Sequence, residues 1–178
     1  MSQQYDNETV VINFFGGAGV GKSTNTARLF ALMKDAGYEV EIVTEFAKDL
    51  VWEDHLNVLD DQFFVSATQN HRLFKLKGRV KFIITDSPLL LGSVYTEDKL
   101  LKSLIESTFN SYDNFNVLLK RVKEYKPNGR LQTEEEAVLV DKFIRDVLNE
   151  GDHEYCEITG DESGVLDLFK TIKDKYKQ

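Results

Sequence analysis

The chain has 178 residues, 42% hydrophobic and 29% charged, a composition typical of one globular α/β domain over residues 1–178, with residues 1–8 expected to be flexible. Its net charge of −8 makes a long nucleic acid a disfavoured partner, because duplex binding usually relies on a basic surface. The single cysteine, Cys156, excludes an intramolecular disulfide, and no apolar run is long enough to span a membrane. The polar N-terminus indicates a cytoplasmic protein, in the host cytoplasm if the chain is viral.

Strand-like runs alternate with helix-like runs along the chain. The strand-like runs are Val10 to Phe15, Glu39 to Thr44, Val80 to Thr85, Asn116 to Leu119 and Tyr155 to Thr159. This alternation predicts an α/β fold with a five-stranded, mainly parallel sheet and helices on both faces. Ligands of such sheets bind beyond the carboxyl ends of the strands, so we expect chemistry in the residues that follow each strand.

The first strand leads directly into a glycine-rich loop, Gly16-Gly17-Ala18-Gly19-Val20-Gly21-Lys22-Ser23, with the G-x-x-x-x-G-K-S spacing of a phosphate-binding loop (P-loop). Glycines let the backbone N–H groups turn inward around phosphates, and the following helix adds the positive end of its dipole. We expect residues Gly16 to Thr24 to bind ATP, with Lys22 at the β- and γ-phosphates and the Ser23 hydroxyl on Mg²⁺. A glycine-rich turn without a ligand is the alternative.

Glu45 closes the second strand, where a carboxylate can accept the proton of an attacking hydroxyl. An exposed glutamate stabilised by a helix N-terminus is an equally good explanation. Farther along, Trp52 is expected to fill core, with stacking on a ligand ring as the alternative.

A long helix from Asp61 to Leu76 places Gln62, Ser66 and Gln69 on one stripe, with Arg72 close by. Amides beside a pocket can read the edge of a base by paired hydrogen bonds, and we take Gln62, Gln69 and Arg72 as candidate substrate-binding residues. A solvated helix face is the more common explanation for such residues.

Asp86 ends the third strand as the carboxylate of a Walker B strand does. In that role it holds the hydration shell of Mg²⁺ or assists proton transfer, so Glu45 and Asp86 are both candidates for the base. The sequence Asp86-Ser87-Pro88 is also typical of the start of a helix, and the two roles are compatible.

The segment from Lys120 to Arg130 holds five cations in eleven residues of an otherwise acidic chain. We expect a lid over about residues 120–132 that closes on the triphosphate and excludes water. Arg121 and Arg130 are the candidates for the transferring phosphoryl group, because arginine makes bidentate phosphate contacts. A solvated turn balanced by the glutamates that follow is the alternative.

Two helices complete the predicted fold. Thr133 and Glu136 have the spacing of a capping box and predict a helix from Thr133 to about Asn149. A last helix from Ser163 to Tyr176 carries an apolar stripe that closes the domain.

Four segments together resemble a known family. They are the Gly16-to-Ser23 loop, Thr44-Glu45-Phe46-Ala47-Lys48, Ile83-Ile84-Thr85-Asp86-Ser87-Pro88-Leu89 and Asn128-Gly129-Arg130-Leu131-Gln132-Thr133-Glu134-Glu135-Glu136-Ala137. The chain resembles the small P-loop nucleotide-kinase-like ATPases of bacteriophages, which are similar to the ribosylnicotinamide kinase domain and more distantly to deoxynucleoside kinases.

This resemblance implies a kinase fold over nearly the whole chain. It matches Glu45 to the acidic residue that follows the second strand of deoxynucleoside kinases. Those enzymes usually carry an arginine next to the acidic residue of the third strand, whereas Asp86 is followed by Ser87-Pro88. The acceptor therefore stays open.

Three functions are consistent with these features. The first is a kinase that uses ATP and Mg²⁺ to phosphorylate a small nucleoside-like or nucleotide-like acceptor. The second moves the acceptor to a polynucleotide, at a terminal hydroxyl or a modified base, and the acidic net charge disfavours it. The third is a regulatory NTPase that acts through a partner.

Overall fold

The computed structural model describes residues 9–122 and 133–176, and one parallel sheet of five strands lies at its centre in the order β2-β3-β1-β4-β5. The strands are β1 (Val10–Phe15), β2 (Val40–Val43), β3 (Phe82–Thr85), β4 (Asp113–Lys120) and β5 (Tyr155–Thr159). Every strand pairs in parallel with its neighbours. The predicted α/β fold is confirmed, and the sheet is wholly parallel.

The crossovers between the strands are mostly helical. The helices are α1 (Lys22–Asp35), α2 (Phe46–Trp52), α3 (Gln62–Phe74), α4 (Lys99–Phe109), α5 (Glu134–Glu150) and α6 (Glu162–Lys175), with two 3₁₀ helices, η1 (Leu56–Asp60) and η2 (Leu89–Val94). The helices predicted after the P-loop and from Asp61, Thr133 and Ser163 are present as α1, α3, α5 and α6. Helix starts were also indicated at Glu45 and at Asp86-Ser87-Pro88, which α2 and η2 follow, whereas α4 and η1 were not predicted.

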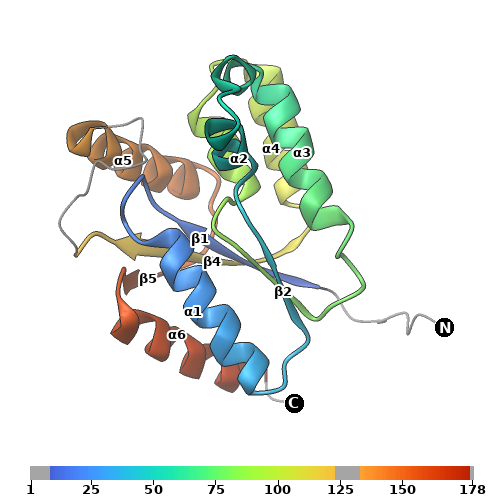
Figure 1. Ribbon diagram of the computed structural model, residues 1–178, viewed down its shortest axis with the longest axis vertical. Coiled ribbons are helices and arrows are strands. Elements are labelled where there is room, and N and C mark those ends of the chain that lie inside the picture. The colour runs from blue at the N-terminus through green and yellow to red at the C-terminus, as the bar shows by residue number, and fades with distance from the viewer. Residues whose placement is uncertain (1–8, 123–132, 177–178) are drawn as a thin grey trace.

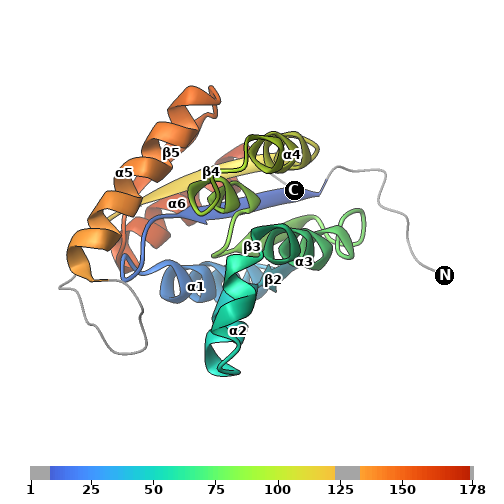
Figure 2. The same ribbon diagram turned by 90° about the horizontal axis from the view of Figure 1, so that it is seen from above.

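Helices cover both faces of the sheet because the side chains of β1 alternate between two cores (Figures 1 and 2). Ile12 and Phe14 pack on one face, with residues of α1 and α6. Val11 and Phe15 pack on the other face, with residues of α3, η2, α4 and α5. β1 is buried along its whole length, so the loop that follows it starts from a fixed point in the protein.

The predicted capping box is present at the start of α5. The Thr133 side chain accepts a hydrogen bond from the Glu136 backbone N–H at 3.2 Å, and the Glu136 carboxylate accepts one from the Thr133 N–H at 2.7 Å. Helix α3 begins in a related way, since the Asp61 carboxylate accepts from the Phe64 N–H at 3.0 Å. These caps fix where two of the helices that border the site begin.

Because all the strands are parallel, their carboxyl ends meet at one edge of the sheet. That edge carries the predicted P-loop after β1, Glu45 after β2, Asp86 after β3 and Arg121 after β4. The predictions for residues 1–8 and for the lid beyond Val122, including Arg130, concern residues outside the described ranges. Within those ranges, no helix combines the length and the apolar character needed to cross a membrane.

Candidate active site

The P-loop links β1 to α1 and exposes the first turn of that helix. Gly21 precedes α1 with a φ of 106°, a left-handed conformation that suits glycine, and it makes no side-chain cap. The N–H groups of the first turn therefore have no side-chain cap and are available to an anion. Among the predicted nucleotide-binding residues, the cavity beside the loop is lined by Ala18, Gly19, Gly21, Lys22, Ser23 and Thr24.

Lys22 lies against the backbone of the loop. Its Nζ donates to the Gly16 carbonyl oxygen at 2.6 Å and to the Gly17 carbonyl oxygen at 3.1 Å. Burial lowers the pKa of Lys22 from its ordinary value, and the nearby carboxylates, Glu45 foremost, oppose that shift. The ammonium group is thus held at the loop, and among the charged groups around it Glu45 has the largest effect on its pKa.

Ser23 and Asp86, the two residues predicted to hold Mg²⁺ (the metal pair), are hydrogen-bonded to each other. The Ser23 hydroxyl donates to Asp86 Oδ2 at 2.6 Å, while Asp86 Oδ1 is buried and has no hydrogen-bond partner in the described part of the chain. A hydroxyl and a carboxylate with an unpartnered oxygen are donors that suit Mg²⁺, a cation that prefers oxygen ligands and retains much of its water. Elsewhere in residues 9–122 and 133–176, no group of three or more His, Cys, Asp or Glu side chains is arranged to hold a metal.

Glu45 lies at the start of α2 and lines the same cavity as Lys22 and Ser23. Its side chain does not cap the helix, and it is partly buried rather than exposed. Burial raises the pKa of Glu45 above its usual range, Lys22 partly offsets this shift, and Asp86 adds to it. A carboxyl with a raised pKa, close to the P-loop lysine, is suited to exchange a proton with a ligand in the cavity.

Gln69 and Arg72 contact the turn that carries Glu45. The Gln69 amide accepts from the Phe46 N–H at 3.0 Å and donates to the Thr44 carbonyl at 3.3 Å. Arg72 donates to the same carbonyl at 3.4 Å and pairs with Asp49 at 2.6 Å. Gln69 also lines the cavity, whereas Arg72 does not. That Gln69 and Arg72 bind substrate stays a prediction. In the structure Gln69 contacts the backbone of the turn, and Arg72 contacts that backbone, Asp49 and the ring of Phe46.

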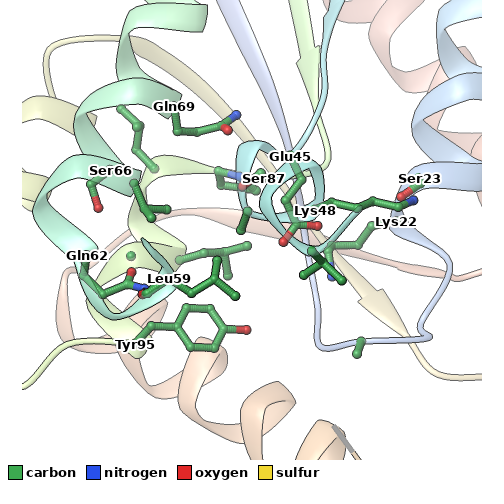
Figure 3. A pocket seen from close by; sticks show the side chains of 18 of the residues that line it. Lys22, Ser23, Glu45, Lys48, Leu59, Gln62, Ser66, Gln69, Ser87 and Tyr95 are labelled. Atoms are coloured by element: carbon green, nitrogen blue, oxygen red, sulfur yellow. The ribbon is translucent and has the colours of Figure 1, made fainter. Parts of the chain in front are cut away.

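The cavity has a volume of about 540 Å³ and runs from the P-loop into a chamber between α2, η1, α3 and η2. Figure 3 shows Lys22 and Ser23 at one end of it, Gln62 and Ser66 at the other, and Glu45 between them. Its volume is in the range of small-molecule sites. The chamber is lined mainly by apolar and aromatic side chains, including Val51, Trp52, Leu59, Val65, Leu89, Leu91 and Tyr95.

The polar side chains that line the cavity beyond the P-loop and Glu45 include Lys48, Gln62, Ser66, Gln69 and Ser87. Gln62 donates from its amide nitrogen to the Leu59 carbonyl at 2.6 Å, which leaves its amide oxygen to accept. The Ser66 hydroxyl is buried and has no hydrogen-bond partner in the described chain. Ser66 lies one helical turn beyond Gln62, on the stripe that the sequence indicated, and it lines the cavity.

The expectation that Trp52 fills core is wrong. Trp52 is 72% exposed and lines the edge of the cavity. Helix α2 buries only Leu50, because it projects away from the sheet, as Figure 2 shows. An aromatic ring at the edge of an apolar chamber is available to a ligand.

Arg121 follows β4 and contacts the P-loop and α5. Its Nη1 donates to the Ala18 carbonyl at 2.9 Å, and its Nε and Nη2 donate to Asp141 Oδ2 at 3.1 and 2.8 Å. The sequence reading missed Asp141. It stands on the predicted helix, one turn after the buried Ala137, and only the fold shows that this face meets the loop.

Two solved structures are similar to this chain in fold. A thymidylate kinase from Ehrlichia chaffeensis has a TM-score of 0.63 at 17% identity, over 96% of this chain and 100% of that chain. A deoxyadenosine kinase from M. mycoides has a TM-score of 0.57 at 19% identity, over 93% and 97% of the two chains. Both are similar to this chain in fold, and no curated protein matches its sequence. The profile of a family described as an AAA domain (AAA_28) matches residues 11–163, and the chain therefore belongs to that AAA-domain family.

Proposed function

We propose that this protein is a kinase that uses ATP and Mg²⁺ to phosphorylate a small nucleoside-like or nucleotide-like acceptor. One observation carries the proposal: a single cavity joins the P-loop, Glu45 and a largely apolar chamber. A donor site and a space of ligand size thus adjoin the same carboxylate. The kinase folds of the two similar structures support this proposal.

The donor side of the site consists of the P-loop and the metal pair. In this proposal the backbone N–H groups from Gly16 to Thr24 hold the phosphates, and Lys22 moves from the loop carbonyls to the β- and γ-phosphates. Ser23 and Asp86 hold Mg²⁺, partly through water, and the metal supplies charge stabilisation of the phosphates. The buried, unpartnered oxygen of Asp86 supports this assignment.

Glu45 is the proposed base. A hydroxyl acceptor must lose a proton as it attacks phosphorus, whereas an ionised phosphate acceptor has none to lose. A partly buried carboxyl in the cavity, with its pKa raised by burial, suits the first case and would repel the second. Within the proposal we therefore favour a hydroxyl as the attacking group.

The acceptor side of the site is the chamber between α2 and η2. Its apolar walls and the exposed ring of Trp52 suit a planar ring, and Gln62 and Ser66 offer hydrogen bonds to its edge. Gln69 and Arg72 are proposed to contribute to acceptor binding indirectly, because they hold the turn that carries Glu45. Arg121 and Arg130 remain the proposed cations for the transferring phosphoryl group.

The test is a search for phosphorylated products by mass spectrometry. Purified protein with ATP and Mg²⁺ is incubated with nucleosides, nucleoside monophosphates, ribosylnicotinamide and oligonucleotides, with Lys22→Ala as the inactive control. A phosphorylated small molecule supports the proposal, and a product from oligonucleotides alone points to the polynucleotide alternative. If ATP binds but no acceptor in the panel is phosphorylated, the proposal is abandoned in favour of a regulatory NTPase.

A further inference from the structure

Asp141 on α5 uses both of its carboxylate oxygens at the P-loop. Oδ1 accepts a hydrogen bond from the Gly17 backbone N–H, and Oδ2 accepts two from the Arg121 guanidinium, at 3.1 and 2.8 Å. Charge-assisted bonds of this kind are stronger than neutral ones. One side chain therefore ties the phosphate-binding loop to the end of β4.

Arg121 completes a closed set of contacts. Besides its two bonds to Asp141, it donates from Nη1 to the Ala18 carbonyl at 2.9 Å. Its side chain is only 15% exposed, so the guanidinium is held between the loop and α5 rather than extended into solvent. A guanidinium has five N–H donors, and these three bonds leave others available at the loop.

The loop and α5 are also in direct backbone contact. A Cβ added to Gly17 would lie 2.4 Å from the Ala137 carbonyl oxygen and 2.9 Å from Asp141 Oδ1. Only glycine fits at this approach. The position of Asp141 relative to the loop is thus fixed by packing as well as by hydrogen bonds.

We propose that Asp141 is a positioning residue for the triphosphate site, which holds the Arg121 guanidinium at the P-loop and so increases the affinity for ATP. Charge alone predicts the opposite result. A carboxylate near a polyanion repels it, and removal of that carboxylate would tighten binding. If Asp141 acts through Arg121, its removal releases a cation from the loop, and binding weakens.

The inference depends on triphosphate binding and not on any acceptor. It is tested by calorimetry with a non-hydrolysable ATP analogue and Mg²⁺, so a protein that binds ATP and phosphorylates nothing would leave the result unaffected. The proposed function and this inference can therefore fail separately.

The experiment compares Asp141→Asn in two backgrounds. In the wild-type protein we expect Asp141→Asn to weaken binding of the analogue about tenfold. Asp146→Asn removes the same charge from an exposed position on the same helix and should leave binding unchanged. In an Arg121→Ala background, Asp141→Asn should weaken binding no further, because the group it positions is absent.

Two results would overturn the inference. Tighter or unchanged binding by Asp141→Asn would show that the carboxylate acts only through its charge or not at all. An equal loss in both backgrounds would show that it acts on the loop through Gly17 alone. Thermal melting without ligand confirms that each variant is folded. If Asp141→Asn fails to fold, Arg121→Lys replaces it, since lysine keeps the charge but lacks the forked donors; unchanged binding by Arg121→Lys would reject the inference.

Discussion

The Gln69 side chain holds the backbone on both sides of Glu45. Its amide oxygen accepts from the N–H of Phe46, and its amide nitrogen donates to the carbonyl of Thr44. Both ends of the amide are thus used on a single turn, and Gln69 is 4% exposed. A residue of α3 thereby fixes the direction in which the carboxylate after β2 points.

Gln69→Leu should lower turnover by about 10- to 100-fold while ATP affinity stays within a factor of about two, since the P-loop is untouched. It should also cost about 1–3 kcal/mol of stability, because the Phe46 N–H loses its partner. Steady-state kinetics, ATP titration and denaturant unfolding measure these effects. His71→Ala, at an exposed position of the same helix, is the control and should change none of them. Normal turnover in Gln69→Leu would remove Gln69 from the proposed mechanism.

The value of kcat/KM should rise as the pH is raised, and the rise should follow a pKa above the usual glutamate range. Burial raises the pKa of Glu45, and a base acts only when it is ionised. Glu45→Gln should remove this rise and lower turnover far more than ATP affinity. An equal loss of turnover and ATP affinity would instead transfer the role of base to Asp86.

The same pKa shift predicts a change in stability with pH. The folded state binds the Glu45 proton more tightly than the unfolded state, so this group's contribution is complete at low pH and is lost as pH rises through the raised pKa. Glu45→Gln should therefore melt at a higher temperature than the wild type at neutral pH. Its advantage should disappear below the ordinary glutamate pKa. Melting curves at several pH values measure this, and an advantage that does not change with pH would refute the pKa assignment.

Asp86→Asn should raise the Mg²⁺ concentration needed for half-maximal activity by about tenfold, because a neutral amide is a weaker ligand than a carboxylate. Ser23→Ala should act in the same direction through loss of the hydroxyl that bonds Asp86. Magnesium titrations at saturating ATP measure both. Glu45→Gln is the control, and its residual activity should show the wild-type Mg²⁺ requirement. Equal requirements in all the variants would place the metal elsewhere.

Trp52 is the only tryptophan in the chain, so intrinsic tryptophan fluorescence reports on the edge of the cavity. A nucleoside acceptor that stacks on its ring should change the emission in the presence of a non-hydrolysable ATP analogue, and ribose should not. Trp52→Ala should raise the acceptor KM about 5- to 50-fold with little effect on ATP affinity, consistent with a stacking loss of about 1–2 kcal/mol. An unchanged KM would mean that the acceptor does not reach Trp52.

The parts of the site that follow local rules could be predicted from the sequence. The P-loop, Glu45 and Asp86 each follow a strand whose apolar run is visible in the chain, and a parallel sheet brings such positions to one edge. The capping box at Thr133 is equally local. No knowledge of packing is needed for these features.

Features that depend on contacts between distant segments could not be predicted. Asp141 lies 124 residues after its partner Gly17, and their meeting depends on how α5 crosses the loop. Trp52 belongs to a residue type that is often buried, but its burial depends on the segments that pack against it. In the described chain no segment covers the side of α2 that carries Trp52. The sequence indicated that Gln69 lies on a polar stripe of its helix. It did not indicate that the Gln69 side chain would bond to the backbone of the turn that carries Glu45.

The two halves of the cavity come from different parts of the chain. The P-loop precedes the chamber residues in the chain and β4 and α5 follow them, whereas the chamber is formed by two segments between β2 and α4 that are separated by β3. A replacement confined to residues 46–74 and 87–95 would therefore exchange the chamber while leaving the triphosphate side intact. Under the proposed function, the specificity for the acceptor can thus change by substitution within those two segments, without change to the residues of the triphosphate side.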